Sequence, residues 1–278
     1  MRTRKFAQVD VFSSAPLRGN PVAVVLDGED ISDEDMQAFA RWTNLSETTF
    51  LLAPTAPEAD YLLRIFTPGG ELPFAGHPTL GSCHAWLRSG NEPLNRRDVV
   101  QECGIGLVHL RVEGDSIAFD APHLRRAGDA TEEETEHAIK ALGVEPSKVH
   151  GVHWVDNGPG WLGVLLDSAD TVLKLEPDFT AMGDAKIGVA GRHDGDGPAD
   201  WEVRAFVPSL GIREDPVTGS LNAGLARWFF DADIVHAPYT VRQGTALGRD
   251  GRITVRPEGE RIWVGGPSTT VISGTVTL

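Results

Sequence analysis

The stretch PFAGHPTLGSCHAWL, residues 73–87, has the composition of an apolar helix but an unusual beginning. It predicts a helix over about 78–88 that closes at Ser89 and Gly90. Gly76 and His77 stand where most helices carry a capping side chain and acidic residues, and Pro78 suits the first helical position. A titratable histidine at the mouth of an apolar helix therefore needs an explanation.

A second copy of this arrangement follows in the other half of the chain. In both halves an Arg-x-Phe-x-Pro segment leads through a loop into a helix that starts with glycine. The matching features are RIFTP (64–68) and RAFVP (204–208), Gly76/Gly81 and Gly219/Gly224, and Trp86 and Trp228. Their shared order indicates an internal duplication. Two copies make two similar domains rather than a solenoid, which needs more repeats.

The surrounding chain predicts an α+β fold. Short apolar segments such as 5–12 and 22–26 read as strands, and Ser32 reads as the N-cap of a helix whose apolar side is Met36, Phe39, Ala40 and Trp42. Residues 99–122 read as a hairpin meander.

The domain boundary is predicted in the polar run RRAGDAT, residues 125–131. A helix follows it, with Thr131 and Glu134 as a capping box and Gly143 at its end. At 278 residues, two domains are the better expectation. We place them at 1–125 and 126–267, with a C-terminal strand, about 268–278, that can return to the first.

Composition and charge exclude several kinds of protein. The formal net charge of −15 offers no basic face for nucleic acid or anionic membrane. No apolar run reaches the ~20 residues of a membrane span, and the first residues lack the apolar core of a secretory signal. Cys83 and Cys103 lack the spacing of a disulfide pair or zinc site. We therefore expect a cytoplasmic protein in which both cysteines are small buried side chains.

The duplication also predicts where a ligand binds. Two similar domains related by a pseudo-twofold axis would bring their equivalent helix N-termini together, and two facing N-termini form an anion-binding cleft. Gly76 and Gly219 would let the ligand approach the backbone, and His77 would face the cleft. A histidine there is also compatible with a capping or packing role.

Three further polar residues occupy suggestive places. Asp215 and Ser220 belong to the second loop, REDPVTGSLNAG. Asp215 is also compatible with a turn before Pro216, and Ser220 with a plain N-cap. Glu47, in NLSETTF, leads into an apolar strand. It is either a strand-edge carboxylate paired with an arginine or a general base whose pKa is raised by apolar surroundings.

Taken together, the sequence resembles the phenazine-biosynthesis isomerase (PhzF) family over essentially its whole length. The resemblance rests on four segments in order: DVFSSAPLRGNPVAVV, NLSETTF, FTPGGELPFAGHPTLG and REDPVTGSLNAGLA. It implies the diaminopimelate epimerase-like fold, in which each of two similar domains is a mostly antiparallel sheet wrapped around a central helix. It also implies a homodimer.

The resemblance further implies roles for individual residues. Glu47 matches the glutamate that moves a proton between two carbons of a dihydro-hydroxyanthranilate ring, His77 and Asp215 match its catalytic partners, and Ser220 matches a serine that contacts substrate. Related racemases carry a cysteine at each helix N-terminus, and neither loop has one here.

The prediction is a cofactor-free isomerase acting on a small carboxylate-bearing substrate, with Glu47, His77 and Asp215 as catalytic residues and Gly76, Gly219 and Ser220 as substrate-binding residues. Neither a nucleotide-binding loop nor metal-ligand spacing appears in the sequence, so we expect no cofactor and no metal. The alternatives are an amino-acid epimerase or dehydratase on the same fold and a non-catalytic metabolite-binding or scaffold protein.

Overall fold

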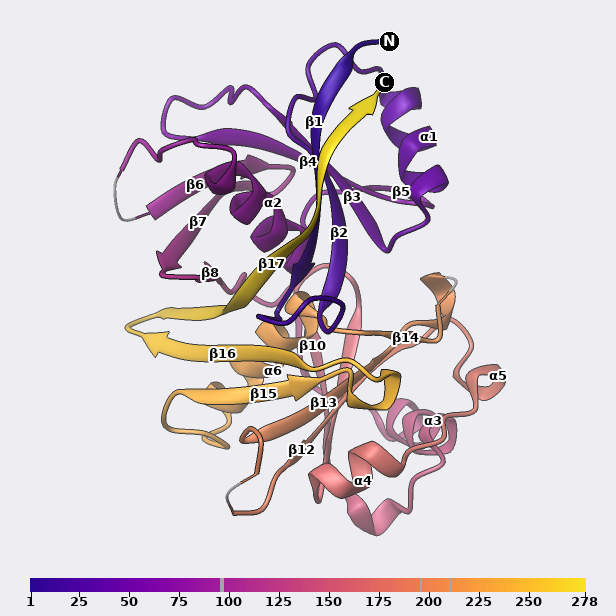
Figure 1. Ribbon diagram of the computed structural model, residues 1–278. Helices are drawn as coiled ribbons and strands as arrows, with labels where there is room; N and C mark the ends of the chain where they lie inside the picture. Colours follow the sequence, from indigo (N-terminus) through magenta and orange to yellow (C-terminus); the bar gives the residue numbers. More distant parts are fainter. Residues whose placement is uncertain (96–97, 196, 211) are drawn as a thin grey trace. The chain divides into compact units, whose positions relative to one another are not determined.

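The chain forms two compact units. The computed structural model describes residues 1–95, 98–195, 197–210 and 212–278 (Figure 1). Met1–Asp120 and Gly265–Leu278 form one unit, the N-terminal unit, and Ala121–Val264 form the other, the C-terminal unit. The sequence placed the boundaries after residues 125 and 267. Each unit is described by itself.

The N-terminal unit is a mostly antiparallel sheet with two helices. Strand β1 pairs antiparallel with β2 and with the end of β17, and β6, β7 and β8 form an antiparallel meander. The elements are β1 (Thr3–Val11), β2 (Asn20–Val25), α1 (Asp33–Thr43), β3 (Glu47–Leu52), β4 (Tyr61–Thr67), β5 (Gly70–Leu72), α2 (Gly76–Arg88), β6 (Asp98–Cys103), β7 (Gly106–Glu113), β8 (Ser116–Asp120) and the last part of β17 (Arg261–Thr277).

The C-terminal unit has the same kind of sheet and more peripheral helices. Its elements are β9 (Arg126–Asp129), α3 (Glu132–Leu142), η1 (Pro146–Lys148), β10 (Val149–Asp156), β11 (Trp161–Leu166), α4 (Ala169–Lys174), α5 (Phe179–Met182), β12 (Lys186–Arg192), β13 (Trp201–Phe206), η2 (Pro208–Leu210), β14 (Glu214–Asp215), α6 (Gly219–Asp231), β15 (Tyr239–Gln243), η3 (Thr245–Leu247), β16 (Gly251–Glu258) and the first part of β17.

The strand pairings reproduce the duplication that the sequence predicts. β1–β2 and β10–β11 are antiparallel, and β2–β3 and β11–β12 are parallel. β3–β4 and β12–β13 are antiparallel, and so are β4–β5 and β13–β14. β4–β6 and β13–β15 are both parallel. Phe66 and Phe206, and Trp86 and Trp228, therefore occupy corresponding elements of the two units.

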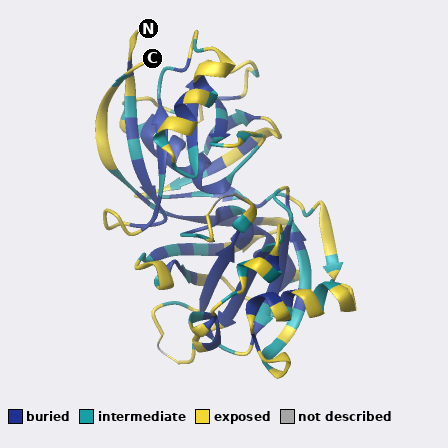
Figure 2. Ribbon diagram, turned by 90° about the vertical axis from the view of Figure 1, so that its right-hand side faces the viewer, coloured by how far each residue is buried: buried dark blue, intermediate teal, exposed yellow. Residues whose placement is uncertain are grey.

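A helix is buried in the middle of each unit. Every residue of α2 from Gly76 to Trp86 is buried, and most of α6 is buried as well. The peripheral helices, by contrast, carry many exposed residues (Figure 2). The apolar sides of the peripheral helices cover the face of each sheet that points away from the buried helix. In the N-terminal unit, Met36, Phe39 and Ala40 of α1 pack on Phe50 and Phe66. Within the described residues, no helix has the length and apolar character of a membrane span.

A glycine at the same place in each buried helix explains how closely the helix packs. A Cβ atom on Gly81 of α2 would lie 2.4 Å from a methyl of Val22 and 2.9 Å from a methyl of Val11. On Gly224 of α6 it would lie 2.2 Å from the backbone oxygen of Val155. Both glycines thus let the helix touch β1 or its counterpart β10.

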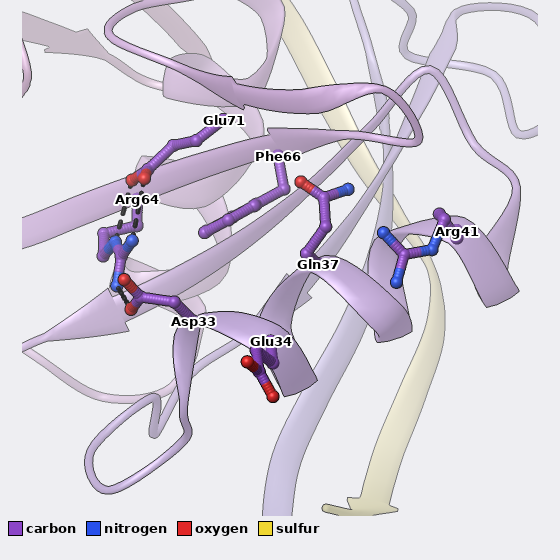
Figure 3. Close-up of a pocket in the computed structure, with 7 residues that line it drawn as sticks. All are labelled: Asp33, Glu34, Gln37, Arg41, Arg64, Phe66 and Glu71. Atoms are coloured by element: carbon purple, nitrogen blue, oxygen red, sulfur yellow. Dashed lines mark hydrogen bonds and ion pairs between the residues drawn. The ribbon is translucent and has the colours of Figure 1, made fainter.

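The arginine of each Arg-x-Phe segment forms a paired hydrogen bond to a glutamate on the neighbouring strand, which we call a clasp. Arg64 donates two hydrogen bonds to Glu71, at 2.8 and 2.7 Å, and lies 5.1 Å from the Phe66 ring (Figure 3). Arg204 does the same with Glu214, at 3.0 and 2.9 Å, and lies 4.9 Å from the Phe206 ring. Each clasp fixes the short strand that precedes a buried helix.

Several local predictions are confirmed and others are wrong. Ser32 caps α1, and Thr131 and Glu134 form both bonds of a capping box. Trp42 is 80% exposed instead of joining the apolar side of α1, because its indole stacks on the outside of Phe39. Pro78 is the third residue of α2 rather than the first, which a first turn tolerates because its N–H groups have no helical partner.

The glycine contact predicts a stability effect. We expect Gly224→Ala to destabilise the C-terminal unit by about 1–3 kcal/mol despite the better helix propensity of alanine, because the backbone oxygen of Val155 cannot move away like a flexible side chain. Urea unfolding measures the change. Gly274→Ala is the control, since a Cβ atom there meets nothing within 4 Å. Equal stability of the two variants would contradict the packing argument.

Candidate active site

Glu47 and His77 meet at the N-terminus of α2. Glu47 is the first residue of β3 and His77 is the second residue of α2. The His77 Nε2 atom lies 3.4 Å from Glu47 Oε2, and the two side chains are 5% and 14% exposed. The structure thus places a carboxyl and an imidazole in contact at the N-terminus of the buried helix α2.

His77 is a neutral imidazole at neutral pH. Burial lowers the pKa of His77 to about 3, and the nearby backbone carbonyl of Pro21 opposes this only in part. Without a charge, the ring can still accept or donate a hydrogen bond toward Glu47.

Asn20 completes the polar cluster around His77. This buried residue begins β2, and its amide nitrogen lies 3.5 Å from Nδ1 of His77. Its amide oxygen accepts a hydrogen bond from Ser46 at 3.5 Å. Asp10 holds the preceding loop by accepting bonds from the backbone N–H groups of Arg18 and Gly19. Sequence reasoning missed Asn20, although it lies in the quoted segment that contains GNP.

Asp215 and Ser220 lie near the N-terminus of α6. Asp215 ends β14, and its Oδ2 accepts a hydrogen bond of 2.5 Å from the Thr218 hydroxyl. The Ser220 hydroxyl accepts a bond of 3.0 Å from the Trp161 indole, so its own proton remains to be donated. Asn157 binds the Ser220 carbonyl at 2.8 Å. Ser220 is the second helical residue; the N-cap is Thr218, so the plain N-cap interpretation is wrong.

Both buried helices begin without a capping side chain and without acidic residues in the first turn. Within the described residues, neither N-cap residue, Ala75 or Thr218, gives a side-chain capping bond, and neither first turn has an acidic residue. By contrast, Ser32 and Thr131 cap the peripheral helices α1 and α3. The first turns of α2 and α6, with Gly76 and Gly219, therefore keep the backbone N–H groups and positive dipole that attract an anion.

The cysteines lie away from the helix N-termini. Cys83 is buried inside α2, where desolvation raises the pKa of its thiol to about 12. Cys103 is buried at the end of β6, where desolvation also raises its pKa. Neither thiol is placed for racemase chemistry. Among the residues that the structure describes, no cluster of three or more His, Cys, Asp or Glu could hold a metal ion.

The six predicted site residues thus form two groups. Gly76, His77 and Glu47 come together in the N-terminal unit. Asp215, Gly219 and Ser220 lie along one segment of the C-terminal unit. That the two groups serve one ligand is part of the proposal below.

Comparison with solved structures identifies the class of fold to which the chain belongs. The fold is that of diaminopimelate epimerase-like proteins. A hydroxyproline epimerase from Agrobacterium vitis shares it with a TM-score of 0.60 and 15% identity, over 99% of this chain and 91% of that one. A PhzF-family protein from Enterococcus faecalis matches with a TM-score of 0.82 and 25% identity, over 100% of both chains.

The sequence comparisons identify the family. Residues 9–274 match the family model described as phenazine biosynthesis-like protein. A Schizosaccharomyces pombe protein named antisense-enhancing sequence 1 is 37% identical over 99% of both chains. Trans-2,3-dihydro-3-hydroxyanthranilate isomerase of Pseudomonas fluorescens is 35% identical, over 97% of this chain and 98% of that one. The chain belongs to the PhzF-like family of isomerases.

The lowered pKa of His77 predicts how stability depends on pH. The folded pKa of about 3 lies below the ordinary 6.5, so the unfolded chain binds more protons in between and stability falls as pH falls through this window. Between about pH 7.5 and about pH 5, we expect wild type to lose about 2 kcal/mol more than His77→Gln.

Urea unfolding at both pH values measures this difference. The matched control is His109→Gln, which replaces an exposed histidine and should lose as much stability as wild type. An equal loss in His77→Gln and wild type would show that His77 is not held neutral by burial.

Proposed function

We propose that this protein is a cofactor-independent isomerase that moves a proton between carbons of a small carboxylate-bearing substrate held by the N-termini of α2 and α6. The observation that carries the proposal is the contact of Glu47 with the buried, neutral His77, 3.4 Å apart at the start of α2. A carboxyl so placed can act as a general base and then as the acid that returns the proton.

The proposed reaction begins at a C–H bond of the substrate. Glu47 takes the proton, and the electron pair moves into a conjugated system that ends at another carbon. The same carboxyl then delivers its proton to that second carbon, so the substrate and product have the same composition. His77, whose Nε2 atom lies 3.4 Å from Glu47 Oε2, restricts the space in which the carboxyl can move. Since the imidazole is uncharged, it does not weaken the carboxylate base as an imidazolium would.

The other half of the site binds and orients the substrate in this proposal. The backbone N–H groups of the first helical turns at Gly76 and Gly219 attract its carboxylate and the negative charge that develops in the transition state. The Ser220 hydroxyl, which already accepts a bond from Trp161, donates its proton to a substrate oxygen. Asp215 accepts a hydrogen bond from a substrate amine or hydroxyl.

The choice of substrate class comes from the relatives. The P. fluorescens relative is named for trans-2,3-dihydro-3-hydroxyanthranilate, a ring that carries a carboxylate and an amine. We propose a related cyclic amino carboxylate as the substrate and that named compound as the first probe. Homodimer formation stays a prediction, to be tested by sedimentation against the chain mass of 30.0 kDa.

The role of Glu47 gives a direct prediction. Glu47→Gln keeps the shape of the side chain and removes the group that carries the proton, so binding should survive while turnover falls by about 10²–10⁴-fold. The measurement is conversion of trans-2,3-dihydro-3-hydroxyanthranilate in deuterium oxide, followed by proton NMR. Glu58→Gln, which changes an exposed glutamate, is the control and should react at the wild-type rate.

The same NMR assay separates the alternatives. Exchange at one carbon with inversion would identify an epimerase, and loss of water a dehydratase. Binding without exchange or conversion would favour a metabolite-binding protein. If Glu47→Gln turns over the probe at the wild-type rate, Glu47 is structural and His77 becomes the leading candidate for the base.

A further inference from the structure

We infer that Gln243 is a positioning residue for Asp215 and acts on it through the Thr218 hydroxyl. Gln243 ends β15 and is fully buried beneath the first turn of α6. The inference rests on the proposed function only in taking Asp215 as a carboxylate of the site. No motif in the sequence marks Gln243, because its partners lie more than twenty residues before it.

The Gln243 amide uses its full hydrogen-bonding capacity on this segment. Its nitrogen donates to the Thr218 hydroxyl at 3.0 Å and to the Asp215 carbonyl at 3.2 Å. Its oxygen accepts from the Thr218 N–H at 3.0 Å and from the Asn222 amide at 2.8 Å. Two donors and two acceptor sites are all that a glutamine side chain offers. The amide can therefore neither rotate nor flip without losing bonds.

The geometry also fixes the direction of the Thr218 hydroxyl. A hydroxyl has one proton to donate, and this one accepts a bond from the Gln243 N–H. Its own proton therefore points to Asp215 Oδ2, 2.5 Å away. A hydrogen bond of this kind favours the ionised carboxylate and holds its orientation. The chain Gln243, Thr218, Asp215 thus fixes the orientation of the Oδ2 oxygen of the Asp215 carboxylate.

Close packing keeps residues 215–218 on β15 and β16. A Cβ atom on Gly251 would lie 2.4 Å from a methyl of Val217, and one on Gly244 would lie 2.7 Å from the Pro216 carbonyl oxygen. Glu214, which precedes Asp215 on β14, is bound to Arg204 of the paired strand β13.

The N-terminal unit holds a counterpart that lacks the carboxylate. Gln101, on β6, is fully buried, and its nitrogen donates to the Thr79 hydroxyl of α2 at 3.0 Å. Its oxygen accepts a bond from Tyr61 at 3.3 Å. Gln101 and Gln243 both lie on the strand that runs parallel to an Arg-x-Phe strand. Both anchor a buried helix, but only Gln243 is linked to an aspartate.

The test is a carboxyl NMR titration that needs no substrate. Wild type and variants are labelled with ¹³C at the aspartate carboxyl carbons, and Asp215→Asn identifies the Asp215 signal. We expect Thr218→Val and Gln243→Leu to raise the pKa of Asp215 by about one unit, because each removes or misdirects the hydrogen bond to the ionised form. Thr218→Ser, which keeps the hydroxyl, and Gln101→Leu should titrate as wild type.

Each outcome decides the inference. If folded Gln243→Leu or folded Thr218→Val titrates as wild type, or if Gln101→Leu shifts the Asp215 signal as far as Gln243→Leu does, the inference is overturned. If Gln243→Leu fails to fold, the Thr218→Val and Thr218→Ser pair decides alone. Failure of the proposed function is separable: full activity of Glu47→Gln would defeat that proposal and leave the Asp215 titrations unchanged.

Discussion

Close contact between a buried helix and the strands of its sheet is the constraint on which the site depends. Gly81 lets α2 touch Val11 and Val22, and Gly224 lets α6 touch Val155. A helix enclosed along its length can offer a ligand only its ends, and the N-terminal end carries unbonded N–H groups and a positive dipole. Because the helix cannot slide or turn against the strand, His77 and Ser220 keep fixed positions in the first turn.

The two units share one fold but place different polar side chains at the start of their buried helices. Asn20 and Asn157 both bind the second residue of a buried helix, yet that residue is His77 in one unit and Ser220 in the other. The carboxylates differ in origin as well, since Glu47 begins β3 and Asp215 ends β14. Racemisation by two equivalent thiols needs the same group in both copies. Unequal groups suit a reaction in which one side moves a proton and the other side binds and orients.

What the sequence predicted well was local. Capping residues such as Ser32, Thr131 and Glu134 act within one turn of the chain, and the duplication is visible as repeated letters. The helix start before Pro78 and the exposure of Trp42 were missed, because tertiary packing decides both. Trp161 and Gln243 were missed because their bonds to Ser220 and Thr218 span 59 and 25 residues. Only the folded sheet brings such partners together.

Burial of His77 has a cost in stability and a consequence for Glu47. Below about pH 6.5 an imidazole is mostly ionised in water, but His77 stays neutral down to much lower pH because desolvation lowers its pKa to about 3. A permanently charged partner 3.4 Å from Glu47 would favour the ionised carboxylate and hinder it from accepting a proton. A neutral ring at this distance does not favour the ionised carboxylate in that way. In the proposed reaction Glu47 both takes and returns one proton, and a neutral neighbour suits both steps, so the proposal accounts for the buried histidine at the start of an apolar helix.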